Sequence, residues 1–265
     1  MKYTFRILRL DPAVDQSPCF QDFIYETPEK KSLLEALMDV RNDQDCSLSF
    51  RYSCREAVCG SCGMVVNGQF DLACRTMIES LGTTLIVIEP LPNLEIQKDL
   101  IVDMEPFWKA LFAIEPYLFP GETRPEKGHR IDDREMEKID QFVNCIMCGC
   151  CYSACPVVSR DERYLGPAAL AKLYRFVTDP RDKRGYGRWS RVNTETGAWG
   201  CDTVFECNEV CPRKVRPADG IEGLRRSLVL EKIKGLYLRD GVECPRLHLL
   251  GGCHPPELRE KREQG

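Results

Sequence analysis

Apolar and polar positions alternate at the start of the chain and predict a β-hairpin. Residues 2–10 and 19–26 are its two strands, with turn-forming Asp-Pro and Ser-Pro pairs between them. A helix is expected next, with Thr27 as its cap and Pro28 at its first position. Its apolar face would consist of Leu33, Leu34, Leu37, Met38 and Val40. A second hairpin through Asn67-Gly68 and a strand at 84–89 complete a small strand-and-helix unit.

From about Met104 the spacing of apolar residues becomes helical. Four helices are expected, over residues 104–119, 132–143, 167–177 and 217–234. The first carries large apolar side chains, which we expect to pack in a core between domains. Residues 179–191 are basic and loop-like. A solvated charged face is the default interpretation of this segment, and contact with anionic lipid or with a partner subunit is the alternative.

Composition narrows the class of protein. The 265 residues are enough for two modest domains, and the 16 cysteines indicate either disulfides or metal. The first residues lack the apolar segment and cleavage site of a signal peptide, so we expect reduced thiols and favour metal. No apolar run approaches the ~20 residues of a membrane-spanning helix. A net charge of −4 gives no argument for nucleic-acid binding.

The first cysteine group is spaced C-x4-C-x2-C, with a fourth cysteine further along. It consists of Cys54, Cys59, Cys62 and Cys74. This is the plant-type [2Fe–2S] spacing, in which a loop wraps the cluster, its amides bond the sulfurs and a neighbouring strand supplies the last thiolate. Gly60 and Gly63 allow a close backbone approach. A four-thiolate zinc site is the alternative, although such sites usually combine two C-x2-C pairs at longer separation.

Two cysteine runs further along the chain share the frame C-x2-C-x2-C-x3-C-P, which bacterial-type ferredoxins use to hold iron–sulfur clusters. The first run contains Cys145, Cys148, Cys151 and Cys155. The second contains Cys201, Cys207 and Cys211, with Val204 at the position of the missing cysteine. In paired runs of this kind the fourth cysteine binds the other cluster. We therefore expect a [4Fe–4S] cluster on Cys145, Cys148, Cys151 and Cys211, and a further cluster on Cys155, Cys201 and Cys207.

Val204 decides the type of the last cluster. Its side chain has no lone pair for iron, and a cube with one unligated corner readily loses that iron. The last cluster is therefore predicted to be [3Fe–4S], with a higher reduction potential than a four-thiolate cluster. Cys150 falls outside the ligand spacing and is expected to be a packing residue, while Cys19 and Cys46 are expected to be small buried residues.

The order [2Fe–2S], [4Fe–4S], [3Fe–4S] resembles the iron–sulfur subunit of succinate dehydrogenases and quinol:fumarate reductases, over about residues 2–235. The segments Gly166-Pro167-Ala168-Ala169-Leu170 and Asp179-Pro180-Arg181-Asp182 also look like this family. The resemblance implies an α+β chain of three parts. These are a plant-type-ferredoxin-like (β-grasp) domain over 1–104, an all-helical bacterial-ferredoxin-like domain over 105–235, and a C-terminal tail over 236–265.

For function, the resemblance implies electron transfer. Electrons would pass between a flavoprotein subunit with covalent FAD, where succinate and fumarate interconvert, and a cytochrome b membrane anchor that carries heme and binds quinone. The chain would lie peripherally on the cytoplasmic side of the cell membrane, held by that anchor. It would contribute cluster ligands and spacers, and no catalytic residue of its own.

The resemblance also places part of a quinone site beside the last cluster, at Pro156, Asp202, Val204 and Arg225. Many succinate dehydrogenases have Trp and His where this chain has Arg160 and Asp202. The difference favours menaquinone over ubiquinone and a fumarate-reductase-like member. Cys62 keeps the four-thiolate form of the first cluster, where some members of the family have Asp.

Two alternatives stay open. The chain could be the iron–sulfur subunit of a related flavin dehydrogenase with another acceptor, such as a thiol or disulfide enzyme, although Val204 argues against the relatives with two complete cubes. A zinc-dependent binding module would instead contain zinc and no iron. The tail holds Cys244, His248, Cys253 and His254, for which a zinc site and docking onto a partner are the two interpretations.

Overall fold

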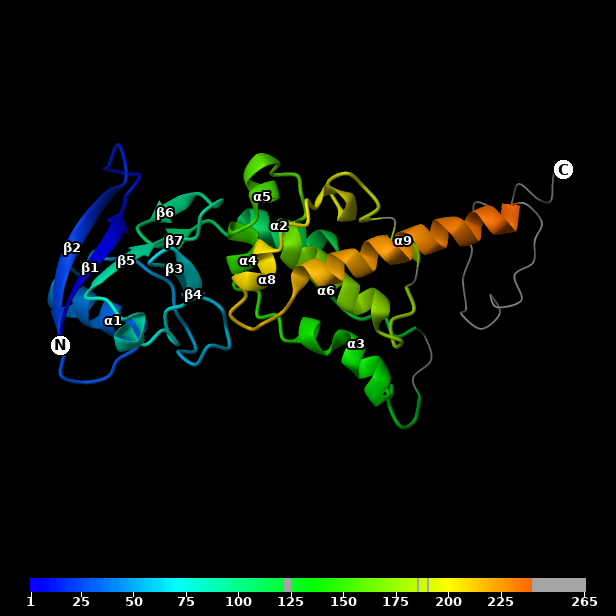
Figure 1. Ribbon diagram of the computed structural model, residues 1–265, viewed down its shortest axis with the longest axis horizontal. Coiled ribbons are helices and arrows are strands. Elements are labelled where there is room, and N and C mark those ends of the chain that lie inside the picture. The colour runs from blue at the N-terminus through cyan, green and yellow to red at the C-terminus, as the bar shows by residue number, and fades with distance from the viewer. Residues whose placement is uncertain (122–124, 185, 190, 240–265) are drawn as a thin grey trace.

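The molecule has two regions that follow each other along its long axis (Figure 1). The computed structural model describes residues 1–121, 125–184, 186–189 and 191–239. A strand-rich N-terminal region precedes a helical one, from which the long helix α9 (Pro217–Arg239) extends away from the sheet (Figure 1). This mixed sheet followed by helices is compatible with the expected α+β class.

The N-terminal region is built on a five-stranded mixed sheet in the order β2-β1-β5-β3-β4. Its strands are β1 (Lys2–Arg9), β2 (Cys19–Glu26), β3 (Gly63–Val66), β4 (Gln69–Leu72) and β5 (Leu85–Glu89). β1 pairs antiparallel with β2, and β3 with β4, which confirms both predicted hairpins. β5 pairs parallel with β1 and antiparallel with β3, and so joins the two hairpins.

Helix α1 (Leu33–Asp43) belongs to the same core as the sheet. Phe5 and Ile7 of β1 are fully buried in that core, together with Leu33 and Leu37 of the helix. The predicted cap at Thr27 is wrong, because Ser32 caps the helix instead. Ser32 Oγ accepts from the amide of Glu35, and the Glu35 carboxylate accepts from the amide of Ser32. This reciprocal box satisfies two amides that would otherwise be unpaired at the helix start.

Asp99 ties the end of the N-terminal region to its beginning. It lies between two short strands, β6 (Ile96–Lys98) and β7 (Ile101–Val102), whereas the 3-10 helix η1 (Ile78–Leu81) comes before β5. The Asp99 side chain is almost fully buried, pairs with Arg9 at 2.9 Å and accepts from the amide of Ser49 at 2.9 Å. Because Ser49 lies just before the first cysteine group, this buried ion pair fixes the segment that leads into it.

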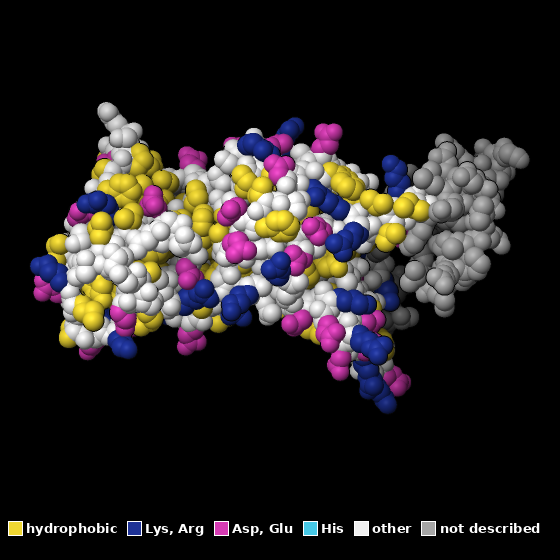
Figure 2. Space-filling model, in the orientation of Figure 1, with side chains coloured by type: hydrophobic (Ala, Val, Ile, Leu, Met, Phe, Trp, Pro, Cys, Tyr) yellow, Lys and Arg dark blue, Asp and Glu magenta, His cyan; other side chains and the backbone are white. Residues whose placement is uncertain are grey.

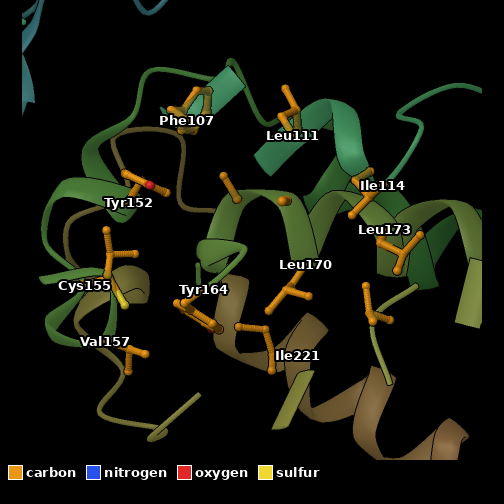
Figure 3. Close-up of a cluster of buried hydrophobic side chains, with 14 of the residues drawn as sticks. Phe107, Leu111, Ile114, Tyr152, Cys155, Val157, Tyr164, Leu170, Leu173 and Ile221 are labelled. Carbon is orange, nitrogen blue, oxygen red and sulfur yellow. The ribbon is translucent and has the colours of Figure 1, made fainter. Parts of the chain in front are cut away.

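The helical region is centred on α6 (Gly166–Thr178), against which α2, α3 and α9 pack. Its elements are α2 (Glu105–Ala113), α3 (Asp133–Val143), α4 (Cys150–Ser153), α5 (Pro156–Arg160), α7 (Tyr186–Trp189), η2 (Ala198–Gly200) and α8 (Glu206–Glu209). The main cluster of buried side chains in this region comes from α2, α4, α5, α6, α9 and the loops between them (Figure 3). All four predicted long helices are present.

Helix α2 ends at Ala113, well before the predicted residue 119, and buried Arg188 explains part of the difference. The backbone is left-handed at Glu115 (φ +49°), which ends the helical path. Arg188 then donates to the carbonyls of Ile114 and Glu115 at 3.2 and 2.8 Å, and also to that of Tyr117. Those carbonyls are thereby satisfied without further helix.

The expectation of a solvated charged face over residues 179–191 is wrong at Arg188. Its side chain is fully buried and pairs with Asp182, itself almost fully buried, at 2.9 Å. Elsewhere on the face in view, acidic and basic side chains are interspersed (Figure 2). The expectation that Cys19 and Cys46 are buried is also wrong, because both are exposed. Of the helices that the structure describes, none is long and apolar enough to span a membrane.

Candidate metal centres

The described part of the chain holds fourteen cysteines, all of them free thiols. Eleven belong to the three groups predicted from spacing, and the others are Cys19, Cys46 and Cys150. Cys150 is fully buried, in agreement with its predicted packing role. Cys244, His248, Cys253 and His254 lie outside the described residues.

The loop of the first group turns its backbone amides toward its sulfurs. The amides of Glu56, Val58 and Cys59 donate to Cys54 Sγ at 3.4, 3.3 and 3.3 Å. The amide of Ala57 donates to Cys74 Sγ at 3.2 Å. Left-handed residues at Arg55 (φ +61°) and Ala57 (φ +56°) produce this curl. Alternating backbone of this kind forms a concave nest of N–H groups suited to an anion such as an iron–sulfur cluster.

The pKa values of two thiols in this first group are shifted in opposite directions. Burial acts to raise the pKa of Cys59, but hydrogen bonds from Ser61 and from the Cys54 amide outweigh it and bring the pKa to about 6. Burial raises the pKa of Cys62 to about 12. One thiolate therefore forms readily near neutral pH, whereas the other loses its proton only when a metal compensates its charge.

The second group surrounds one cavity. Its lining includes Cys145, Cys148, Cys151 and Cys211, together with apolar Ala168, Ala171 and Val215. These four cysteines are the set predicted for the [4Fe–4S] cluster, and Cys211 comes from the other run. Gly149, with φ +87°, turns the chain between Cys148 and α4. Burial raises the pKa of Cys145, Cys151 and Cys211, so metal binding here must displace protons.

The third group consists of Cys155, Cys201 and Cys207. Cys155 and Cys207 are buried, and the amide of Thr203 donates to Cys201 Sγ at 3.3 Å. Burial, followed by the nearby Cys201 and Cys155, raises the pKa of Cys207 to about 12. Val204 is half exposed and lies between two left-handed residues, Thr203 (φ +60°) and Phe205 (φ +65°).

Two short helices connect the second and third groups. α4 contains Cys151, and Cys155 follows it; α8 contains Cys207, and Cys211 follows it. The two helices contact each other. Each one therefore leads from one group to the other in opposite directions, which is the crossed arrangement expected of paired runs.

The first and second groups meet at two glycines. A Cβ atom on Gly60 would lie 2.9 Å from the Cα and Cβ of Cys148, and one on Gly63 would lie 3.3 Å from the Cys148 carbonyl. The two cysteine loops are therefore in direct backbone contact. The sequence predicts a close backbone approach at these glycines, but it does not mark the segment that they contact.

Two side chains that hold the groups in place were not predicted from the sequence. Arg75, next to Cys74, donates to the carbonyl of Pro212 at 2.5 Å and so joins the first group to the second. Asn93 donates to the carbonyls of Ser153 and Cys155 at 2.7 and 3.2 Å. Neither partner is near in sequence, so no local pattern marks these residues.

The predicted quinone-site residues have different roles in the fold. Asp202 pairs with Arg160 at 2.5 Å on the surface, and Pro156 is the first residue of α5. Arg225 is used to hold the loop of the third group: it donates to the Ala198 carbonyl at 2.8 Å and to Thr203 Oγ1 at 3.0 Å, and also to the Cys201 carbonyl. Trp199, Val204 and Phe205 expose apolar surface beside this loop, at 43%, 50% and 42%.

The chemistry of the three groups fits iron–sulfur clusters. Amides directed at sulfur and buried, unpaired thiols are what a cluster with bridging sulfides requires. Within the described residues, no three His, Cys, Asp or Glu side chains converge closely enough to hold a single metal ion. An iron–sulfur cluster is larger than a single metal ion, so its cysteine ligands lie further apart, as they do around the cavity of the second group. When bound, each such cluster would act as a one-electron carrier.

Family models match both regions. The model of a 2Fe-2S iron-sulfur cluster binding domain matches residues 4–109, and that of a 4Fe-4S dicluster domain matches residues 141–215. The chain is 39% identical over 227 residues to the fumarate reductase iron-sulfur subunit of Haemophilus influenzae, covering 81% of this chain and 88% of the relative. It is 36% identical over 235 residues to the succinate dehydrogenase iron-sulfur subunit of Coxiella burnetii, covering 88% and 99%.

A solved structure shares the fold. A chain of the Mycobacterium smegmatis Sdh1 complex in the apo form superposes with a TM-score of 0.79, covering 88% of this chain and 97% of that one, at 23% sequence identity. The arrangement of a strand-rich region followed by a helical one is therefore common to both proteins.

Proposed function

Because the chain belongs to the family of iron–sulfur subunits of succinate dehydrogenases and fumarate reductases, we propose that it conducts electrons between a flavoprotein subunit with FAD and a quinone at a heme-carrying membrane anchor. The chain is a subunit of an enzyme complex of this class and carries electron transfer alone. The family carries [2Fe–2S], [4Fe–4S] and [3Fe–4S] clusters.

We assign the three cysteine groups to these clusters in chain order. The [2Fe–2S] cluster falls to Cys54, Cys59, Cys62 and Cys74; the [4Fe–4S] cluster to Cys145, Cys148, Cys151 and Cys211; and the [3Fe–4S] cluster to Cys155, Cys201 and Cys207. The cavity that gathers cysteines from both runs is the observation that carries this assignment. The finer architecture that goes with it is a β-grasp domain followed by a bacterial-ferredoxin-like helical domain, divided near residue 104, with the tail beginning near residue 236.

In this role the chain's own residues set the distances between the cysteine groups and shield those groups from water. Gly60 lets the first and second cysteine loops touch, which keeps the electron step between them short. Helices α4 and α8 hold the second and third groups at a fixed separation. Burial of Cys155 and Cys207 keeps water away from the third group. Nearby dipoles therefore have a stronger electrostatic effect on the reduction potential there.

The third group is the end of the path that faces the membrane in this proposal. Trp199, Val204 and Phe205 offer exposed apolar surface for an anchor subunit. The quinone would lie near Pro156, Asp202, Val204 and Arg225. The ion pair of Asp202 with Arg160 replaces the Trp and His of many succinate dehydrogenases, which supports menaquinone. The chain would thus be peripheral on the cytoplasmic side of the membrane.

Purification of the complex from membranes tests this proposal. A tagged chain should bring down a flavoprotein with covalent FAD and a heme-containing anchor, and the complex should couple fumarate reduction to a naphthoquinol better than to a ubiquinol analogue. Preference for the ubiquinol would overturn the menaquinone assignment alone. A flavoprotein that recovers with a soluble thiol or disulfide enzyme, and without an anchor, would overturn the quinone path.

A further inference from the structure

The hydroxyl of Tyr164 is a buried donor without an acceptor. The side chain is 2% exposed, and its hydroxyl has no hydrogen-bond partner among the described residues. The backbone around it is well held: the Tyr164 amide donates to the Asp161 carbonyl and the Leu165 amide to the Thr196 carbonyl, both at 3.0 Å. Leaving a buried hydroxyl unpaired costs free energy. A rigidly placed donor of this kind indicates an acceptor that is complete only when the neighbouring site is filled.

The ring of Tyr164 lies against the third cysteine group. A Cβ on Gly200, the residue before Cys201, would lie 3.0 and 3.3 Å from ring atoms of Tyr164. In Figure 3, Tyr164 lies between Cys155 on one side and Leu170 and Ile221 on the other. Burial raises the pKa of Tyr164, and the three thiols that add to this effect are Cys201, Cys155 and Cys207. The contact at Gly200 therefore places the ring of Tyr164 at the loop that leads into Cys201.

An ordered water is a poor partner for this hydroxyl. A buried water needs two to four polar partners, whereas Leu170 and Ile221 beside the ring are fully buried apolar residues. A neutral thiol is a weak acceptor, but a thiolate or a bridging sulfide carries negative charge and accepts strongly.

We propose that Tyr164 donates a hydrogen bond to a sulfur of the cluster held by Cys155, Cys201 and Cys207, and thereby raises the reduction potential of that cluster. The inference rests on the proposed function for the presence of the cluster and adds a positioning residue to it. The direction follows from charge: the reduced cluster is more negative, so an O–H donor stabilises it more than the oxidised one. The effect adds to that of the missing fourth thiolate at Val204.

The variant Tyr164→Phe removes the hydroxyl and keeps the ring. In the complete complex, a redox titration followed by the EPR signal of the oxidised [3Fe–4S] cluster should show a roughly tenfold loss in the one-electron reduction equilibrium, a fall of about 59 mV. The matched control is Tyr174→Phe, whose ring packs on Phe142 beside Cys145 and Cys211. That control should leave the [3Fe–4S] potential unchanged.

A second measurement detects the proton itself, first in the unaltered complex and then in the variant. Proton ENDOR on the oxidised [3Fe–4S] cluster should show a coupled proton that exchanges in D2O and that Tyr164→Phe removes. An unchanged potential, or the absence of such a proton in the unaltered complex, would overturn the role of Tyr164 while the cluster assignment stands. Absence of any [3Fe–4S] signal in the unaltered complex would overturn the cluster assignment and the inference together.

Discussion

The backbone of Gly60 abuts Cys148, and a methyl group on Gly60 would lie 2.9 Å from both the Cα and the Cβ of that cysteine. This contact joins a loop of the N-terminal region to a loop of the helical region. It places the first and second cysteine groups next to each other, with no side chain between them at this point.

Gly60→Ala should therefore separate the two loops. Gly60 has φ +74°, and an alanine there costs about 1–2 kcal/mol for the left-handed backbone, with about 1–3 kcal/mol more for overpacking. Gly68→Ala is the matched control, because Gly68 has φ +76° but open space around it. Thermal unfolding should show a larger loss for Gly60→Ala, and rapid-mixing kinetics should show slower reduction of the second cluster. Equal losses in the two variants would contradict a close contact.

Val204→Cys should supply the missing fourth ligand. The side chain is half exposed, so the substitution leaves the core intact. The third cluster should convert toward [4Fe–4S], with a lower potential and slower quinone reaction, and the EPR signal of the oxidised [3Fe–4S] cluster should disappear. Val204→Ala, which offers no lone pair, should keep that signal. Persistence of the signal in Val204→Cys would refute the ligand assignment at this group.

Arg188→Met should destabilise the helical region strongly. The substitution leaves Asp182 buried without its ion-pair partner. It also removes the donor of the Ile114 and Tyr117 carbonyls and one of the two donors of the Glu115 carbonyl. A loss of about 3–5 kcal/mol in the free energy of unfolding is expected. Arg163→Met breaks an exposed pair with Asp161 and should cost only about 0–1 kcal/mol. Denaturant unfolding of the two variants would decide the matter, and similar small losses would show that the buried network is dispensable.

Cys59 should be far more reactive than Cys62 when iron is removed. Its pKa is lowered to about 6, so the thiolate predominates above that pH, and the rate of iodoacetamide alkylation should rise through pH 6 and then level off. Cys62, with its pKa raised to about 12, should react slowly up to pH 9. Ser61→Ala removes a hydrogen bond to Cys59 and should move its profile to higher pH. Peptide mapping by mass spectrometry measures each rate, and similar profiles for Cys59 and Cys62 would contradict this difference.

Local pattern was enough for the strands of the main sheet, for the long helices and for the spacing that marks the three cysteine groups. Alternation predicted β1 and β2, apolar spacing predicted the long helices, and the regular ligand intervals marked the cysteines. Contacts between distant segments could not be read in this way. Arg75 meets the Pro212 carbonyl, and Asn93 meets those of Ser153 and Cys155, only because the two regions pack together. Arg188 looked like a surface charge, since its burial depends on a loop more than seventy residues earlier.

Helix boundaries were less predictable than helices. Thr27 and Ser32 both have capping side chains, and the choice of Ser32 depends on Glu35 three residues later. The early end of α2 depends on Arg188 and on the backbone of Glu115. In each case a specific hydrogen bond outweighs the apolar spacing that predicts the element.

Low-temperature EPR of the purified complex, combined with iron and zinc analysis, shows whether the chain holds three iron–sulfur clusters. We expect a [3Fe–4S] signal in the oxidised protein as isolated and a [2Fe–2S] signal after dithionite reduction, with iron and no stoichiometric zinc. Zinc in place of iron, in a protein without either signal, would contradict the three-cluster path for electrons.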